Sequence, residues 1–283
     1  MLDLAVGASG QGESSVQSRG RAYVVAGVPA GSVDLSTSAA WVDGSTSYDR
    51  VSRVVVLPDA TGDGVADLAV GAYTWSDNDG RGGVFVFAGP LSGALTLADA
   101  AVSLEGEVED GQASYALASA GDVDGDGHSD LLAGAPYADG SADEAGLAYL
   151  VLGPPSSGSL AGADVRFVGD EARADLGFSV AGGGDFDGDG RHDVLLGAPA
   201  ADTNSTDSGG AWLYYAPGAG SLTPADADLV LIAETARDAA GSAVAFVGNV
   251  NGDCCDDAMV GAVEADRGGS GSGVGYLVLG QGL

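Results

Sequence analysis

The sequence predicts an all-β protein, a β-propeller built from repeats of about 63 residues with four antiparallel strands per blade. Three observations lead to this prediction. An acidic loop recurs four times, at intervals of 63, 63 and 64 residues. Short apolar runs bounded by Gly or Pro recur in phase with these loops. The chain also contains 49 Gly among its 283 residues, which is typical of many short strands joined by tight turns.

Each repeat places its apolar runs in the same order. In one copy the runs lie at 176–181, 193–199, 210–215 and 228–232, and each has strand length and is too short for a helix. The third run recurs at 23–27, 84–89, 148–153 and 275–280. A Gly-Ala pair ends the second run in five copies, beginning at residues 7, 71, 134, 197 and 261. Because these pairs keep phase with the acidic loops, chance does not explain them.

Four strands per period predict a small antiparallel sheet repeated around an axis. A linear array of separate β domains is the alternative, but so Gly-rich a four-stranded unit would bury little core alone. We count eighteen expected strands, whereas seven blades would need about 28. We therefore expect an incomplete ring, or five blades that close imperfectly, in a single domain. The expected repeats span 1–47, 48–110, 111–173, 174–237 and 238–283.

The four acidic loops have the ligand pattern of calcium sites. Calcium takes six to eight oxygen ligands, which a nine-residue loop supplies from side chains at positions 1, 3, 5 and 9 and a carbonyl at position 7. Gly at position 6 permits the sharp turn. The expected ligands are Asp59, Thr61, Asp63, Val65 and Asp67 in loop one, and Asp122, Asp124, Asp126, His128 and Asp130 in loop two. Loop three offers Asp185, Asp187, Asp189, Arg191 and Asp193, and loop four offers Asn249, Asn251, Asp253, Cys255 and Asp257.

The loops are unequal as calcium sites. Loops two and three have all four carboxylates, so we expect two full sites. Thr61 weakens loop one, and loop four has two neutral amides and Cys254 where Gly is expected. Good turns could also account for Asp-Gly-rich loops, although four phased copies with ligands at alternate positions favour calcium. An EF-hand is excluded because position 12 of every copy is apolar.

The sequences Leu-Gly-Phe-Ser-Val-Ala, Gly-Asp-Phe-Asp-Gly-Asp-Gly and Leu-Gly-Ala-Pro, within residues 176–199, resemble the FG-GAP repeat of integrin alpha-subunit propellers and related bacterial proteins. The copies at 114–136 and 242–262 are looser matches, and the copy near Tyr48 lacks the Phe-Gly element. The resemblance implies a seven-bladed propeller with calcium loops on one face and protein ligands bound mainly on the other. It also implies an extracellular location.

Composition excludes several classes of function. The 41 acidic and 10 basic residues give a net charge of −31, which argues against nucleic acid or anionic membranes as partners. No apolar run approaches the length that spans a bilayer, and the first residues do not form a signal peptide. His128 and His192 lie inside the loops, where we expect their side chains to face solvent. Cys254 and Cys255 are adjacent, a poor start for a disulfide or a zinc site.

The sequence thus predicts a non-enzymatic, calcium-binding extracellular β-propeller that mediates cell adhesion or surface recognition. Its expected partner is a protein or glycan ligand at the cell surface, without nucleic acid and without direct membrane insertion. Two alternatives stay open. A propeller-type hydrolase or lyase acting on surface glycans predicts converging titratable groups, and a passive structural spacer within a larger surface protein predicts no specific partner.

Overall fold

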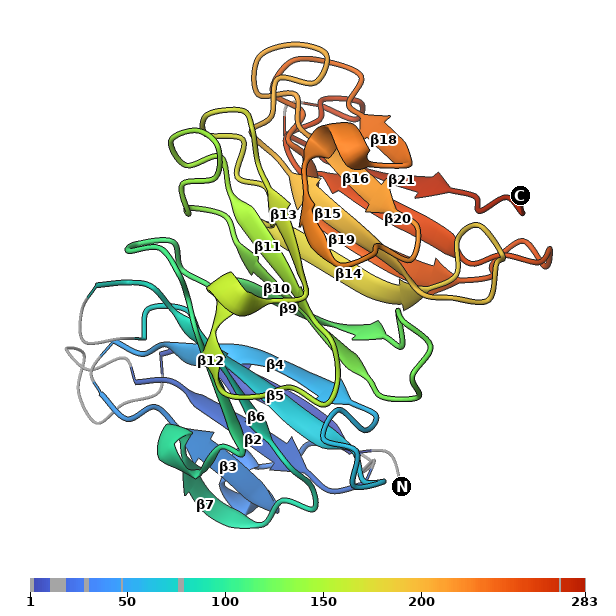
Figure 1. The fold of residues 1–283 in the computed structure, drawn as a ribbon. Helices are drawn as coiled ribbons and strands as arrows, with labels where there is room; N and C mark the ends of the chain where they lie inside the picture. The colour runs from blue at the N-terminus through green and yellow to red at the C-terminus, as the bar shows by residue number, and fades with distance from the viewer. Residues whose placement is uncertain are drawn as a thin grey trace.

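The computed structural model describes residues 3–10, 19–27, 31–46, 48–75, 79–269 and 271–282. Within these ranges the chain forms 21 strands in five sheets, with short 3-10 turns between some of them. Figure 1 shows the sheets following one another in sequence order, from β2 and β3 at one end to β20 and β21 at the other. The all-β prediction is confirmed, and the sheets are the blades of a β-propeller.

The sheets are built as follows. The first contains β1 (Leu4–Ala8), β2 (Arg21–Val25), β3 (Ala40–Asp43) and β7 (Gly93–Thr96). The second contains β4 (Val51–Leu57), β5 (Asp67–Ala72), β6 (Gly83–Phe87), β8 (Val102–Glu105) and β12 (Gly158–Ser159). The third contains β9 (Ala116–Gly121), β10 (Asp130–Ala135), β11 (Leu147–Val151), β13 (Val165–Val168) and β17 (Gly220–Leu222). The fourth contains β14 (Ser179–Gly184), β15 (Asp193–Ala198), β16 (Gly210–Tyr214) and β18 (Leu229–Ile232), and the fifth β19 (Ala240–Gly248), β20 (Asp257–Ala262) and β21 (Val274–Val278).

Three short strands were not predicted from the sequence. Strands β7, β12 and β17 each pair in parallel with the outermost strand of the preceding sheet, β3, β8 and β13 respectively. They are two to four residues long and lie mostly at exposed positions. The expected four-stranded antiparallel unit therefore holds for the second, third and fourth blades, and the second and third also receive one parallel strand from the next repeat at the outer edge.

The hydrophobic core is divided into layers between neighbouring sheets. On β6, Phe85 and Phe87 pack toward the first sheet, whereas Val84 and Val86 pack toward the third. This alternation follows from strand geometry, because successive side chains point to opposite faces. Strands β5, β10 and β15 are buried along their whole length, since a sheet covers each of their faces. Continuous apolar runs in the sequence are the result.

The repeated Gly-Ala pair marks the closest approach between blades. A Cβ on Gly134 would lie 2.0 Å from the carbonyl oxygen of Gly177, and one on Gly197 would lie 2.1 Å from that of Gly241. The turn that contains Gly177 occupies the start of the run expected at 176–181, so β14 begins only at Ser179. Glycine in the second strand thus admits the backbone of the next blade.

The fifth sheet has an exposed apolar face. Met259 on β20 is 41% exposed and Leu277 on β21 is 50% exposed, whereas the matching side chains of the fourth sheet, Leu195 and Leu213, are fully buried. The buried pair packs against the fifth sheet. In the part of the chain that the structure describes, no helix is long and apolar enough to cross a membrane.

Candidate metal centre

All four acidic loops connect the first and second strands of a blade. Loop one joins β4 to β5, loop two joins β9 to β10, loop three joins β14 to β15, and loop four joins β19 to β20. Register shifts break the pairing of the two strands beside loops two, three and four. Loops two, three and four therefore lie at a local irregularity of the hairpin, and position 9 begins the second strand in all four loops.

Loops two and three each bring three carboxylates together. Oxygens of Asp122, Asp124 and Asp130 lie within 4.8 Å of one another, and oxygens of Asp185, Asp187 and Asp193 do the same. These are positions 1, 3 and 9 of the expected ligand pattern. Three negative charges at this separation repel one another strongly, so each cluster has the chemistry of a cation site.

Loop three provides a direct test of fit to a hard cation. The Oδ1 atom of Asp185 is buried and has no hydrogen-bond partner, although its side chain points into the carboxylate cluster. A buried carboxylate oxygen without a partner is unfavourable unless it binds a cation. The residues present therefore fit calcium, and Asp185, Asp187 and Asp193 would hold it in this loop.

Burial makes the ninth-position carboxylates difficult to ionise. Removal from solvent, together with the charges of Asp124 and Asp122, raises the pKa of Asp130 to about 6. Burial and the charges of Asp187 and Asp185 raise the pKa of Asp193 in the same way, again to about 6. A bound cation would favour the ionised form, because it offsets both the repulsion and the cost of burial.

The ninth-position carboxylate also ties the loop to the third strand of its blade. Oδ1 of Asp130 accepts a hydrogen bond from the N–H of Gly153 at 2.9 Å, and Oδ2 accepts one from Val123 at 2.7 Å. The same link to the end of the third strand recurs in every repeat, from Gly27 to Asp3, Gly89 to Asp67, Ala216 to Asp193 and Gly280 to Asp257. Position 9 therefore has a structural role that the sequence reading missed.

The fifth-position carboxylates do not join the clusters of loops two and three. Oδ1 of Asp126 accepts a hydrogen bond from the N–H of His128, and Oδ1 of Asp189 accepts one from Arg191, both at 2.8 Å. Asp189 also forms an ion pair with the Arg191 guanidinium at 2.8 Å, which lowers the pKa of that carboxyl. Their ligand role, like that of the seventh-position carbonyls, stays a prediction.

Loop one differs at Thr61. Its N–H donates to Oδ2 of Asp67 at 2.7 Å, and its hydroxyl lies 3.3 Å from Oδ1 of the same residue. The first- and fifth-position carboxylates keep their loop hydrogen bonds, from Gly62 to Asp59 and from Val65 to Asp63. A neutral hydroxyl thus replaces one carboxylate, which leaves the loop intact but lowers the negative charge available to a cation.

We expect Thr61→Asp to raise the calcium affinity of loop one about tenfold, because it restores the charge count of loops two and three. Isothermal titration calorimetry would measure the dissociation constant of the weakest class of calcium sites. The isosteric but neutral Thr61→Asn is the matched control, and it should leave the affinity near that of the unmodified protein. Equal effects of the two substitutions would show that charge does not limit this loop.

The two histidines face the neighbouring loops, so the expectation that they face solvent is wrong. Both are half-buried. Nδ1 of His192, at position 8 of loop three, accepts a hydrogen bond from the N–H of Asp122 at 2.9 Å. His128 packs beside Gly62 of loop one, where an added Cβ would lie 2.9 Å from the imidazole. The side chains thus fill the space between successive loops.

In loops two, three and four, the residue at position 8 links the loop to the one before it. The N–H of Ser129 donates to the Asp59 carbonyl at 3.1 Å, and the N–H of Asp256 donates to the Asp185 carbonyl at 2.8 Å. His192 makes the equivalent contact to Asp122 through its ring. The first ligands of loops one, two and three are therefore each held in place by the next loop along the chain.

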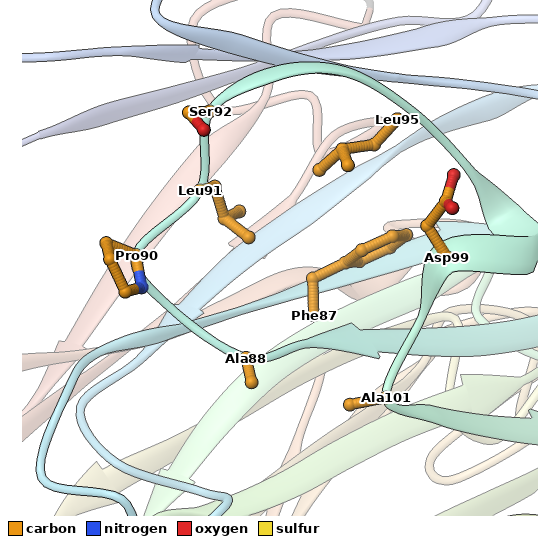
Figure 2. Close-up of a pocket in the computed structure, with 8 residues that line it drawn as sticks. All are labelled: Phe87, Ala88, Pro90, Leu91, Ser92, Leu95, Asp99 and Ala101. Carbon is orange, nitrogen blue, oxygen red and sulfur yellow. The ribbon is translucent and has the colours of Figure 1, made fainter.

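Figure 2 shows a pocket beside the end of β6, with a volume of about 280 Å³. Its lining is mostly apolar, and Asp99 is its one titratable side chain. The Asp99 carboxylate accepts hydrogen bonds from the N–H and the hydroxyl of Thr96, which lowers its pKa. This pocket therefore lacks the pair of converging titratable groups that the hydrolase or lyase alternative requires.

In a comparison with known protein families, residues 114–151 and 176–214 match the model of the FG-GAP repeat. Integrin alpha-5 of Xenopus laevis is 32% identical over 158 residues, which is 53% of this chain and 15% of that protein. Integrin alpha pat-2 of Caenorhabditis elegans is 28% identical over 57% of this chain and 14% of its own length. Phosphatidylinositol-glycan-specific phospholipase D of Rattus norvegicus is 29% identical over 64% of this chain and 22% of its own length. The chain thus spans less than a quarter of these relatives.

Proposed function

Because this chain contains FG-GAP repeats and is similar to integrin alpha subunits, we propose that it is an extracellular, calcium-binding β-propeller that recognises a protein or glycan at a cell surface. The observation that supports this proposal most strongly is the pair of carboxylate clusters in loops two and three. They lie in phase on adjacent blades, and both fall within the matched repeats. Calcium at these clusters has a structural role, and the protein is not an enzyme.

The proposed role of calcium is to fix the edge of the propeller where the loops meet. Calcium would offset the repulsion between the carboxylates at positions 1, 3 and 9 and so fix the conformation of the loop. The position-8 contacts would then hold the neighbouring loop in place as well. Calcium would therefore bind the folded state preferentially and stabilise it. Loops two and three are the proposed full sites, and loops one and four the weaker ones.

The proposed recognition surface lies at the opposite ends of the strands. Tyr115 precedes β9 and Tyr137 follows β10, so both lie away from loop two. The Tyr115 ring contacts Tyr137 at 5.5 Å, Tyr73 at 5.9 Å and Phe178 at 5.1 Å between centroids, all four being half-buried. The Arg53 guanidinium lies 5.4 Å from the Tyr115 ring. Clustered aromatic side chains beside arginine are typical of protein recognition sites.

Binding of surface components from the source organism would test the proposed function. Immobilised protein is expected to retain a defined ligand in millimolar calcium and to release it with a calcium chelator. Tyr137→Ala should weaken retention at least about tenfold without changing calcium affinity, since it removes an aromatic anchor remote from the loops. Tyr48→Ala, a solvent-exposed tyrosine outside the ring contacts named above, is the matched control.

Three outcomes would count against the proposal. Retention that depends neither on calcium nor on Tyr137 would contradict ligand recognition by this surface. If no component is retained at all, the chain is better explained as a passive structural spacer. The similarity to a phosphatidylinositol-glycan-specific phospholipase D suggests one substrate for the enzymatic alternative. The same preparation should therefore be assayed for cleavage of a phosphatidylinositol-glycan anchor. Turnover by this chain would overturn the non-enzymatic part of the proposal.

A further inference from the structure

Loop four differs from the other loops at its sixth position. The sixth-position residues Gly64, Gly127 and Gly190 adopt φ angles of +82°, +93° and +91°. Cys254 occupies the same position, but it is not among the described residues with positive φ. A side chain at this position disfavours the left-handed conformation. Loop four therefore departs from the calcium loops at position 6, although it keeps the hydrogen bonds from Gly252 to Asn249 and from Cys255 to Asp253 that loop two makes at the same positions.

The side-chain amides of Asn249 and Asn251 form hydrogen bonds within loop four. Nδ2 of Asn249 donates to the carbonyl of Asp253 at 2.7 Å, and Nδ2 of Asn251 donates to the Asp253 carboxylate at 2.6 Å. The N–H of Asp253 in turn donates to Oδ1 of Asn251 at 2.9 Å. Both amides are neutral and engaged within the loop. The loop is therefore ordered without the charge neutralisation that loops two and three require.

The bend at Cys254 and Cys255 places two sulfur atoms on one side of the chain. Successive side chains of an extended strand point to opposite faces, yet here the two Sγ atoms are 2.6 Å apart. Sγ atoms of both cysteines and a carboxylate oxygen of Asp253 all lie within 4.8 Å of one another. A hydrogen bond from the Cys255 N–H lowers the pKa of Asp253, so its carboxylate is ionised.

Two glycines make room for the sulfur atoms. A Cβ on Gly188 would lie 2.9 Å from Sγ of Cys255, and a Cβ on Gly282 would lie 3.2 Å from Sγ of Cys254. Cys255 is buried in this gap, whereas Cys254 is exposed. One thiol is thus anchored between loop three and the C-terminal segment, and the other is accessible from solvent.

We propose that Asp253, Cys254 and Cys255 form a site for one thiophilic divalent cation of the zinc or cadmium class. Soft thiolate ligands select such ions over calcium, which prefers the all-oxygen clusters of loops two and three. Two sulfurs and one carboxylate make a three-ligand set with an open fourth position for water. Binding releases the two thiol protons to solvent. This site combines two cysteines, which the other loops lack, with Asp253, the fifth-position carboxylate that every loop has.

Titration with Cd²⁺ alone would test the proposal on the full chain. The cysteines are first reduced with a phosphine, and calcium is kept in excess so that oxygen sites are occupied. We expect one equivalent of Cd²⁺ to produce a thiolate-to-cadmium charge-transfer band. Cys254→Ser should weaken this binding at least about tenfold, and Asp253→Asn should weaken it less. Asp124→Asn in loop two is the matched control and should leave the titration unchanged.

Three results would overturn the proposal. They are the absence of the band in protein with two reactive thiols, a band of equal intensity in Cys254→Ser, and a cysteine pair that stays joined after reduction. Cys255 is buried, so Cys255→Ser could fail to fold. The exposed position of Cys254 lets Cys254→Ser decide the question alone, with circular dichroism confirming its fold.

Discussion

Replacing Gly134 by alanine is expected to destabilise the protein by about 3 kcal/mol and to lower the melting temperature by about 10 °C. The added Cβ would lie 2.0 Å from the Gly177 carbonyl oxygen, and its three nearest atoms are all backbone atoms of that residue. Backbone cannot rotate away, so β10 and the turn of the next blade must move apart. Differential scanning calorimetry in excess calcium would measure the change.

Gly261→Ala is the matched control for this prediction. Gly261 has the same place in β20 of the fifth sheet, but the nearest atom to its added Cβ is 3.5 Å away. An ordinary van der Waals contact of this kind should change stability by less than about 0.5 kcal/mol. Equal losses at the two positions would mean that intrinsic strand propensity, and not close approach between blades, sets the requirement for glycine.

Calcium removal is expected to lower the melting temperature by about 15 °C. At a calcium concentration 100-fold above the dissociation constant, each full site contributes about 2.7 kcal/mol, and loops two and three together contribute about 5 kcal/mol. Thermal melts with and without a calcium chelator would measure this difference. An unchanged melting temperature would rule out a structural role for calcium.

The double variant Asp124→Asn/Asp187→Asn sharpens this measurement. It removes one carboxylate from each cluster, so the difference between the calcium-bound and calcium-free melts should shrink to a few degrees. Without calcium, the variant is expected to melt at or above the unmodified protein, because repulsion within each cluster is lower. A variant that melts far lower without calcium would indicate that these side chains stabilise the loops in some other way.

The pH dependence of the calcium-free protein provides a second measure of the same clusters. The folded pKa values of Asp130 and Asp193, about 6, lie above the value of about 3.9 in an unfolded chain. The folded state therefore binds these protons more tightly, and their stabilising effect is lost as pH rises through 6. The calcium-free melting temperature should fall from pH 5 to pH 7, while the increment due to calcium grows over the same range.

The repeat period and the glycine positions allowed the fold to be predicted from sequence. Both reflect strong local constraints, since β5, β10 and β15 are covered on both faces and Gly134 contacts the backbone of the next blade. The edge strand Gly158–Ser159 could not be predicted, because an exposed backbone pairing of two residues requires no apolar pattern.

The candidate site was only partly predictable. Positions 1, 3 and 9 converge in loops two and three as the carboxylate spacing indicates. The position-8 contacts were missed because Ser129 and Asp256 use backbone groups and His192 uses its ring, so no common residue type marks them. The close approach of the Cys254 and Cys255 sulfurs depends on a local bend that adjacent cysteines in a sequence do not reveal.

The parallel edge strands have a consequence for how such a chain can grow by duplication. Strands β7, β12 and β17 each belong to one repeat but pair with the sheet of the repeat before it, so each connects two neighbouring sheets. Copying a segment one full period long preserves these pairings, because the copied unit both gives an edge strand and receives one, as the second and third repeats do. Copying half a period would instead leave an edge strand without a sheet to pair with. Selection on sheet pairing alone would therefore keep the spacing near 63 residues while the loops between strands diverge.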